Sequence, residues 1–224
     1  GRIGEGAVAL AFRSGVLAIA FRGPNTSSAG TVAFINRDGR PEAPPVRVGA
    51  QPTMLVFSPD GKKLLVPGRG EASDDYGTDP EGTLSVIDWC RSFPCSRPDI
   101  KVIDFRAFNA RRQELVARGV RLLGPGADVA DDLEPESVTV SPDSRTAWIT
   151  LQRNNALAVV DLVRNEVRDI LPLGSKNHLL KGRGLDASDE DGRIRIARWP
   201  LRSWYQPDYI AAFPANGRTF LVTA

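Results

Sequence analysis

Residues 51–66 read QPTMLVFSPDGKKLLV, and residues 134–149 repeat the pattern as EPESVTVSPDSRTAWI. A looser copy, QPDYIAAFPANGRTFL, occupies residues 206–221, and a degenerate copy, AVALAFRSGVLAIAF, occupies residues 7–21. In each copy an apolar run meets a turn, after which a second apolar run returns. Proline presets φ for such a turn, aspartate bonds back to the backbone, and glycine accepts a positive φ. Each copy therefore predicts a β-hairpin.

A further apolar run follows each of three copies, at residues 30–35, 83–88 and 156–161. Recurring units of a hairpin plus a strand are typical of propeller blades. The sequence thus predicts an all-β fold, a β-propeller of four-stranded blades. A sandwich of two packed sheets is the alternative, but it does not explain why the turn recurs.

We place the blade-like units near residues 5–48, 49–104, 133–172 and 205–224 of a single propeller portion. The long inter-blade insertions then cover residues 105–132, with a short helix over 110–119, and residues 173–204. Closed propellers have about four to eight blades. With about four units visible, we expect a partial ring whose open edges pair with the remainder of the same protein or with another extracellular chain.

Composition limits the partners. The chain has 224 residues, and its 29 basic side chains nearly balance its 27 acidic ones. Nucleic-acid binding needs a concentrated basic face, so no nucleic-acid partner is expected. No apolar run approaches the roughly 20 residues that span a membrane, so no membrane span is expected in this chain.

Two features favour an oxidising compartment. Cys90 and Cys95 enclose four residues, which favours a small disulfide loop, although free thiols or a metal site remain open. Asn25-Thr26-Ser27 is a sequon for N-glycosylation at Asn25 in a Gly/Pro/Ser-rich loop. Together they predict an extracellular or cell-surface glycoprotein.

Two loops concentrate carboxylates in a pattern that suits Ca²⁺, which takes six to eight oxygen ligands. The candidate ligands are Glu71, Asp74, Asp75, Asp79 and Glu81 in the first loop and Asp186, Asp189 and Asp191 in the second. The second loop does not keep the register of an EF-hand. The alternative for both loops is a solvated acidic turn whose side chains cap backbone groups.

Other polar and aromatic residues are candidates for binding: Glu134, Glu136, His178, Trp204 and Tyr205. Their alternatives are turn capping for the glutamates, a loop hydrogen bond for the only histidine, and core packing for the rings. No Ser-His-Asp triad, nucleophile elbow, phosphate-binding loop or zinc spacing is present. No catalytic residue is assigned, and whether the chain is an enzyme stays open.

Several stretches resemble the choice-of-anchor I family, which includes mesenchyme-specific cell-surface glycoproteins and related bacterial exported proteins. The likeness runs from about Glu5 to Ala224, and its motifs are GEASDDY (70–76), DPEG (79–82), LEPE (133–136), TLQRNNA (150–156), GLDASD (184–189) and YQPD (205–208). The resemblance implies a YncE-like propeller that is exported and held at the cell surface or in extracellular matrix. Family chains continue past the position of Ala224, so this chain looks like a piece.

The chain also departs from the family pattern at two places. Residues 67–69 read PGR where the family usually has Ala-Asn-Glu, which weakens any ion site implied there. Residues 176–178 read KNH where the family usually has Lys-Asp-His.

The leading hypothesis is a structural or interaction propeller that calcium stabilises within a larger glycoprotein assembly. A metal-dependent phosphoesterase is the first alternative, and it requires carboxylates from several blades to converge. A carbohydrate-binding module that uses Trp199, Trp204 or Tyr205 is the second alternative.

Overall fold

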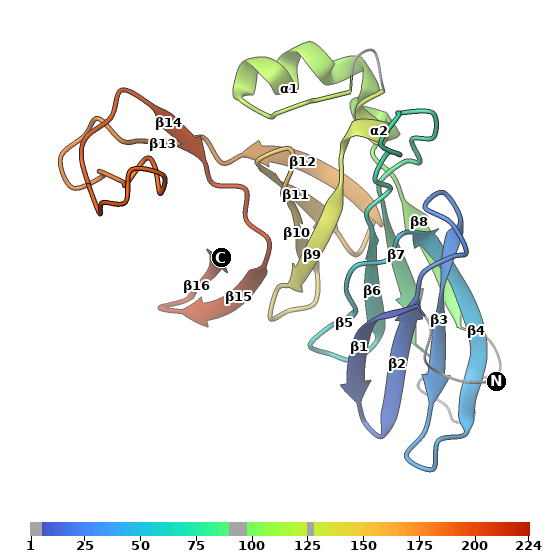
Figure 1. Cartoon of the computed structure of the whole chain (residues 1–224). Coiled ribbons are helices and arrows are strands. Elements are labelled where there is room, and N and C mark those ends of the chain that lie inside the picture. The colour runs from blue at the N-terminus through green and yellow to red at the C-terminus, as the bar shows by residue number, and fades with distance from the viewer. Residues whose placement is uncertain (1–5, 90–97, 125–127) are drawn as a thin grey trace.

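The computed structural model describes residues 6–89, 98–124 and 128–224, and strands dominate it (Figure 1). Three antiparallel sheets of four strands follow one another, and sequence neighbours pair within each. The first sheet contains β1 (Ala7–Arg13), β2 (Val16–Phe21), β3 (Ala29–Ile35) and β4 (Pro41–Ala50). The second contains β5 (Val56–Phe57), β6 (Lys63–Gly68), β7 (Thr83–Asp88) and β8 (Asp99–Ile103). The third contains β9 (Pro135–Val140), β10 (Thr146–Leu151), β11 (Ala156–Asp161) and β12 (Glu166–Pro172).

The sheets lie side by side as successive blades. Strands of neighbouring sheets meet, since β1 contacts β5 and β6 contacts β9. β9 in turn contacts β15 (Ile210–Ala215), which forms a hairpin with β16 (Arg218–Thr223). Four-stranded meanders arranged in this way are the blades of a β-propeller, so the expected fold class is confirmed. In the described part of the chain the blades form an open arc and not a closed ring (Figure 1).

The Ser-Pro-Asp turns contain the local hydrogen bonds that fix their shape. The Ser58 hydroxyl donates to Asp60 Oδ1 at 2.7 Å and accepts the backbone amide five residues later at 3.0 Å. Ser141 donates to Asp143 Oδ1 at 2.6 Å and likewise accepts the amide five residues later at 2.9 Å. The Ser141 hydroxyl and a backbone amide stabilise the carboxylate, and they lower the pKa of Asp143.

Successive turns also contact one another, which links the repeats to the packing of the blades. The Ser144 hydroxyl accepts the backbone amide of Asp60 at 3.0 Å, and so joins the turn of the third blade to that of the second. Arg13, the last residue of β1 before the turn of the first blade, donates to the carbonyl oxygens of Ser58 at 3.1 Å and Pro59 at 2.7 Å. The recurring turn therefore holds neighbouring blades in register.

Apolar residues fill the spaces between neighbouring blades in two clusters. One cluster lies between the first and second blades and includes Val32, Phe34, Leu64, Val66 and Ile87. The other joins the second and third blades to the first insertion and includes Phe105, Phe108, Leu115, Leu133 and Ile149. Burial of these side chains provides the main driving force that holds one blade against the next.

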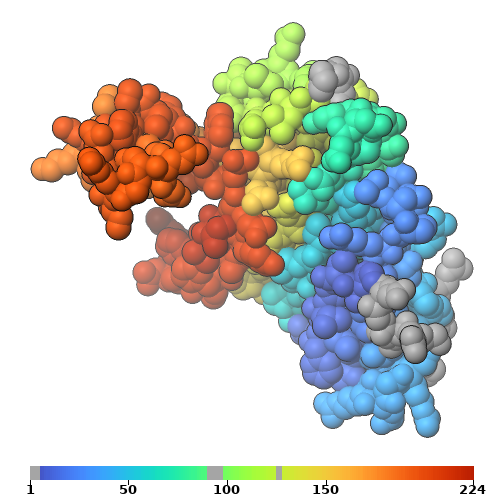
Figure 2. Space-filling view, viewed as in Figure 1, coloured from blue at the N-terminus to red at the C-terminus, as the bar shows by residue number. Residues whose placement is uncertain are grey.

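The two insertions differ in how they pack. The first contains η1 (Arg106–Arg111), α1 (Arg112–Arg118) and α2 (Val129–Asp132), and it includes the expected helix. Its Phe108 and Leu115 belong to the core. The second contains the short pair β13 (Ser175–Asn177) and β14 (Arg202–Trp204), and it projects away from the blades (Figures 1 and 2).

Candidate functional site

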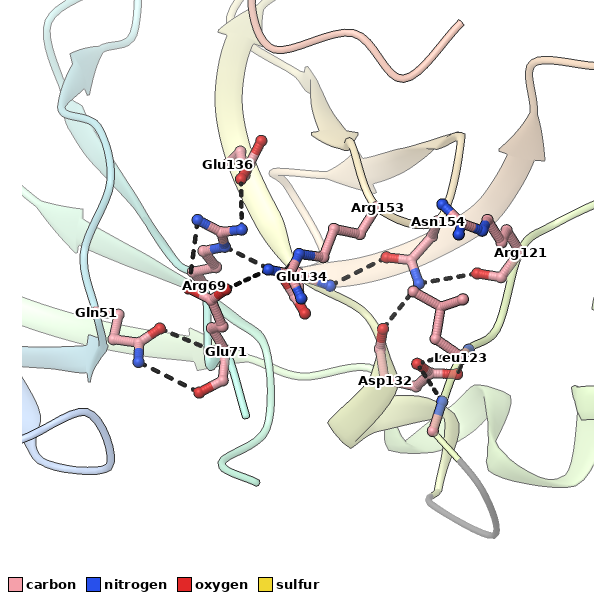
Figure 3. Close-up of polar contacts among 11 residues, drawn as sticks. Gln51, Arg69, Glu71, Arg121, Leu123, Asp132, Glu134, Glu136, Arg153 and Asn154 are labelled. Atoms are coloured by element: carbon pink, nitrogen blue, oxygen red, sulfur yellow. Dashed lines mark hydrogen bonds and ion pairs between the residues drawn. The ribbon is translucent and has the colours of Figure 1, made fainter. Parts of the chain in front are cut away.

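Charged side chains converge where the second and third blades meet. Arg69 follows the last residue of β6, Glu134 precedes β9, and Glu136 lies within β9. Glu71 lies two residues beyond Arg69, and Arg153 lies in the turn between β10 and β11. We call these five residues the arginine–glutamate cluster (Figure 3).

Arg69 is the centre of this cluster because its guanidinium reaches all three carboxylates. Its Nε lies 3.0 Å from Glu134 Oε2, its Nη2 lies 3.3 Å from Glu136 Oε1, and its Nη1 lies 3.4 Å from Glu71 Oε2. Arg153 closes the network, with Nε 3.3 Å from Glu134 Oε2 and Nη2 2.5 Å from Glu71 Oε1. A planar guanidinium suits such simultaneous pairing better than the ammonium of a lysine.

Two amide side chains hold the backbone around the cluster. Gln51 accepts the backbone amide of Glu71 at 2.8 Å and donates to its carbonyl oxygen at 3.2 Å. Asn154 is fully buried, accepts the amide of Glu134 at 3.1 Å and donates to the carbonyl oxygens of Asp132 at 2.7 Å and Arg121 at 3.0 Å (Figure 3). The cluster is therefore connected to the first insertion by direct hydrogen bonds.

Burial sets the electrostatics of the two innermost carboxyls. Desolvation raises the pKa of Glu134 even though Arg69 and Arg153 oppose the shift. Desolvation also raises the pKa of Glu136, and the negative charges of Asp208 and Glu134 add to that effect. Both groups consequently favour protonation more than a solvent-exposed glutamate does.

Two cavities lie beside the cluster. The larger, of about 410 Å³, includes Arg69, Glu136 and Asp208 in its wall, and the smaller, of about 290 Å³, includes Arg69 and Glu71. Arg22 and Thr53 line both cavities. The cluster thus borders two hollows whose volumes are close to those of small-ligand sites.

The predicted calcium residues of the first loop have separate contacts. Glu71 belongs to the arginine–glutamate cluster, and Glu81 Oε1 lies 2.6 Å from Nε of Arg106. Asp75 accepts the Ser73 hydroxyl at 2.7 Å in a local turn. Burial, and then the charges of nearby carboxylates including Asp131, raise the pKa of Asp79. For Asp74 no side-chain hydrogen bond or ion pair is found within the described residues.

The second acidic loop has local contacts of its own. Asp186 accepts the backbone amide of Arg195 at 2.9 Å, and Asp191 accepts that of Arg193 at 3.0 Å. Asp189 is exposed. The segment that carries this loop projects on the opposite side of the molecule from residues 71–82 (Figure 1), so the two loops do not meet. Across residues 6–89, 98–124 and 128–224, no three His, Cys, Asp or Glu side chains are grouped to hold a metal ion.

The remaining predicted binding residues lie outside the cluster. His178 is buried, and its two ring nitrogens lie 2.7 Å from the Arg183 carbonyl oxygen and 2.8 Å from the Ser203 hydroxyl. These two contacts stabilise the second insertion, and His178 lines neither of the two cavities. Trp204 and Tyr205 keep 48% and 54% of their surface exposed, which is more than core packing would leave.

Two predicted modifications have different outcomes. Cys90 and Cys95 lie outside the described residues. Asn25 is exposed, and its Oδ1 accepts the hydroxyls of Ser27 at 3.0 Å and Ser28 at 2.6 Å. No helix in the described part of the chain is long and apolar enough to span a membrane.

Glu134 and Glu136 are the only cluster members that we singled out as binding residues from the sequence. Glu71 was expected as a calcium ligand, and the ion pairs of Arg69 and Arg153 were not expected. One signal for Arg69 was visible, since it replaces a glutamate of the family pattern. Nothing in the sequence alone indicated that Arg153, 84 positions later, would meet the same carboxylates.

Comparison with solved structures finds matches of low sequence identity, among them two named as β-propeller domains. The β-propeller domain of Cps50 (Swd1) from Myceliophteria thermophila is 12% identical, with a TM-score of 0.46, over 74% of this chain and 43% of that one. The hydrazine synthase of Kuenenia stuttgartiensis is 13% identical, with a TM-score of 0.48, over 94% and 56%. The β-propeller domain of the Trilobed protease from Pyrococcus furiosus is 15% identical, with a TM-score of 0.39, over 74% and 42%. The chain thus spans about half the length of these structures or less.

Comparison with curated proteins finds no matching relative. A family model, by contrast, covers nearly the whole sequence: the choice-of-anchor I domain matches residues 4–224. The match includes all three four-stranded blades, both insertions and every member of the arginine–glutamate cluster. The chain belongs to the choice-of-anchor I domain family.

Proposed function

We propose that this chain is the interaction module of a cell-surface or secreted protein, and that it acts by binding and not by catalysis. The observation that carries the proposal is the pairing of carboxylates with arginines in the arginine–glutamate cluster. Its three carboxylates are each paired with an arginine, an arrangement that suits a fixed recognition surface. Two cavities beside the cluster provide concave surface for a ligand or partner.

Export is supported by family membership and by the exposed sequon at Asn25. The test uses cells that produce the protein naturally and an antibody against it. Protease added to intact cells should remove the protein, or the protein should appear in the medium, while a cytosolic marker stays intact. Protection of the protein until the cells are lysed would contradict the proposal.

We further propose that Ca²⁺ stabilises the first acidic loop. Burial and the charges of Asp131 and Asp132 raise the pKa of Asp79. Burial and the charge of Glu81 likewise raise the pKa of Asp131. A divalent cation would relieve this repulsion between carboxylates. As placed, these side chains do not form a complete ligand set, so backbone carbonyls or water would have to supply the other ligands.

Thermal denaturation with and without a chelator tests the calcium proposal. We expect Ca²⁺ to raise the Tm, the chelator to reverse the increase, and Asp79→Asn to abolish it. Asp189→Asn is the matched control, because it removes a carboxylate from the other acidic loop. A Tm that does not respond to Ca²⁺ would remove calcium from the account and leave the binding function intact.

A carbohydrate ligand is a second candidate, favoured by the exposure of two consecutive aromatic residues, Trp204 and Tyr205. Exposed aromatic faces can stack on sugar rings. We expect a glycan array to show binding that Trp204→Ala removes and Trp199→Ala leaves largely intact. Equal binding by wild type and Trp204→Ala would exclude this surface.

A further inference from the structure

The larger cavity combines apolar walls with two carboxylates. It lies against β1, the segment before β5, the start of β9 and the segment before β15. Its apolar side chains are Val8, Leu10, Pro52, Met54 and Leu55, and its charged side chains are Arg22, Arg69, Glu136 and Asp208. Tyr209, which is 62% exposed, also lines it.

Glu136 supplies the most unusual atom in this cavity. The residue is only 9% exposed, and its Oε1 pairs with Arg69 at 3.3 Å. Its Oε2 is buried and has no hydrogen-bond partner among the described residues. Figure 3 shows one end of this carboxylate facing Arg69 while the other points away. A buried carboxylate oxygen without a donor is costly, so a ligand that donates to it gains more than one at an exposed site.

Asp208 provides a second carboxylate in the same wall. It is exposed, and its negative charge reaches Glu136. Around the cavity and the cluster, the arginines Arg22, Arg69 and Arg153 face four carboxylates, those of Glu71, Glu134, Glu136 and Asp208. These charges leave one carboxylate in excess, and Glu136 Oε2 is a buried oxygen of this set without a hydrogen-bond donor in the described part of the chain.

We propose that this cavity binds a primary ammonium group carried on an alkyl stem. The ammonium would donate to Glu136 Oε2 and to Asp208, the stem would lie along Leu10 and Met54, and the ring of Tyr209 would face the cation. A volume of about 410 Å³ lies within the range of small-molecule sites.

A divalent metal ion fits the same cavity less well. Only two carboxylates line it, and the guanidinium of Arg69 lies 3.3 Å from one of them. A doubly charged ion would be repelled by that guanidinium, and the apolar walls would supply it with no ligands. A singly charged ammonium with an alkyl stem uses both the carboxylates and the apolar wall.

This inference goes beyond the proposed function because it names the chemistry of a ligand. It holds in whichever compartment the protein acts. The test is an NMR titration of ¹⁵N-labelled protein with n-butylamine, and separately with Nα-acetyl-lysine methylamide, up to about 10 mM. We expect saturable shifts of the Ser137 and Tyr209 amides. The norleucine analogue and n-butanol carry the stem without the ammonium and should not bind. Tighter binding of the lysine compound indicates a lysine side chain of a protein partner, and tighter binding of butylamine indicates a free amine.

Variants decide whether the two carboxylates are responsible. Glu136→Gln should weaken amine binding by about tenfold, and Asp208→Asn, at an exposed position, should weaken it several-fold without affecting folding. Glu166→Gln removes the same charge from outer strand β12 and should leave binding unchanged. The proposal is overturned if neither amine binds, if the uncharged analogues bind as well, if Asp208→Asn binds like wild type, or if Ca²⁺ displaces the amine at equal concentration. None of these outcomes depends on the protease treatment of intact cells, which tests the proposed location of the protein.

Discussion

Replacing Arg69 with methionine should destabilise the protein in a way that depends on pH. The variant keeps most of the side-chain stem but removes the charge that reaches Glu71, Glu134 and Glu136. Removing one partner of a buried ion pair costs about 3–5 kcal/mol. The Arg69 side chain is 24% exposed, and Arg153 still pairs with two of the three carboxylates. We therefore expect a loss at the lower end, about 3 kcal/mol at pH 7.

The direction of the pH dependence follows from the raised pKa values of Glu134 and Glu136. A carboxyl whose pKa is higher in the folded than in the unfolded state binds its proton more tightly when folded. Its favourable contribution is full at low pH and is lost as the pH rises through the folded pKa. Without Arg69 both pKa values should rise further, so acidification from about pH 7 to about pH 5 should narrow the deficit to about 1 kcal/mol.

Urea denaturation of wild type and Arg69→Met at both pH values measures this effect. Arg106→Met is the matched control, because Arg106 makes an exposed ion pair with Glu81, and its change should be much smaller at either pH. A deficit for Arg69→Met that stays constant or grows on acidification would refute the reasoning about the buried carboxyls.

Three further substitutions test other parts of the account. Asn154→Ala removes three buried hydrogen bonds and should cost about 3 kcal/mol, with faster proteolysis of the first insertion. Ser141→Ala should lower the free energy of unfolding by about 1–2 kcal/mol, because the buried hydroxyl that closes the turn is lost. Unchanged stability in urea denaturation would mean that the turn does not need this hydroxyl. Gly82→Ala should destabilise by more than about 2 kcal/mol, since its Cβ would lie 1.9 Å from the Leu133 carbonyl oxygen; a soluble variant with wild-type Tm would contradict this packing.

The recurrent turn made the fold class predictable. Residues such as Ser58 and Ser141 act within five positions of themselves, and so their roles can be read from a short stretch. Strand alternation is equally local, and β3 shows it with every second residue buried.

The candidate site was less predictable because it depends on contacts between blades. Arg69 and Glu134 are 65 positions apart, and only the packing of β6 beside β9 brings them together. For the first acidic loop too, spacing alone did not indicate which partner each carboxylate contacts. Spacing placed Asp75 and Glu81 in one candidate ligand set, whereas the structure pairs Asp75 with Ser73 and Glu81 with Arg106.

The central claim is that the second and third blades meet along their inner strands, and Met54 tests it most directly. Met54 is the only methionine, and its sulfur accepts hydrogen bonds from the Ser137 hydroxyl at 3.3 Å and the Val138 amide at 3.4 Å. Protein labelled with ¹³C in the methionine methyl group gives a single methyl signal. We predict nuclear Overhauser effects from that signal to the amide protons of Ser137 and Val138. Their absence in the folded protein would contradict the arrangement of blades from which the site, the cavity and the proposed ligand all follow.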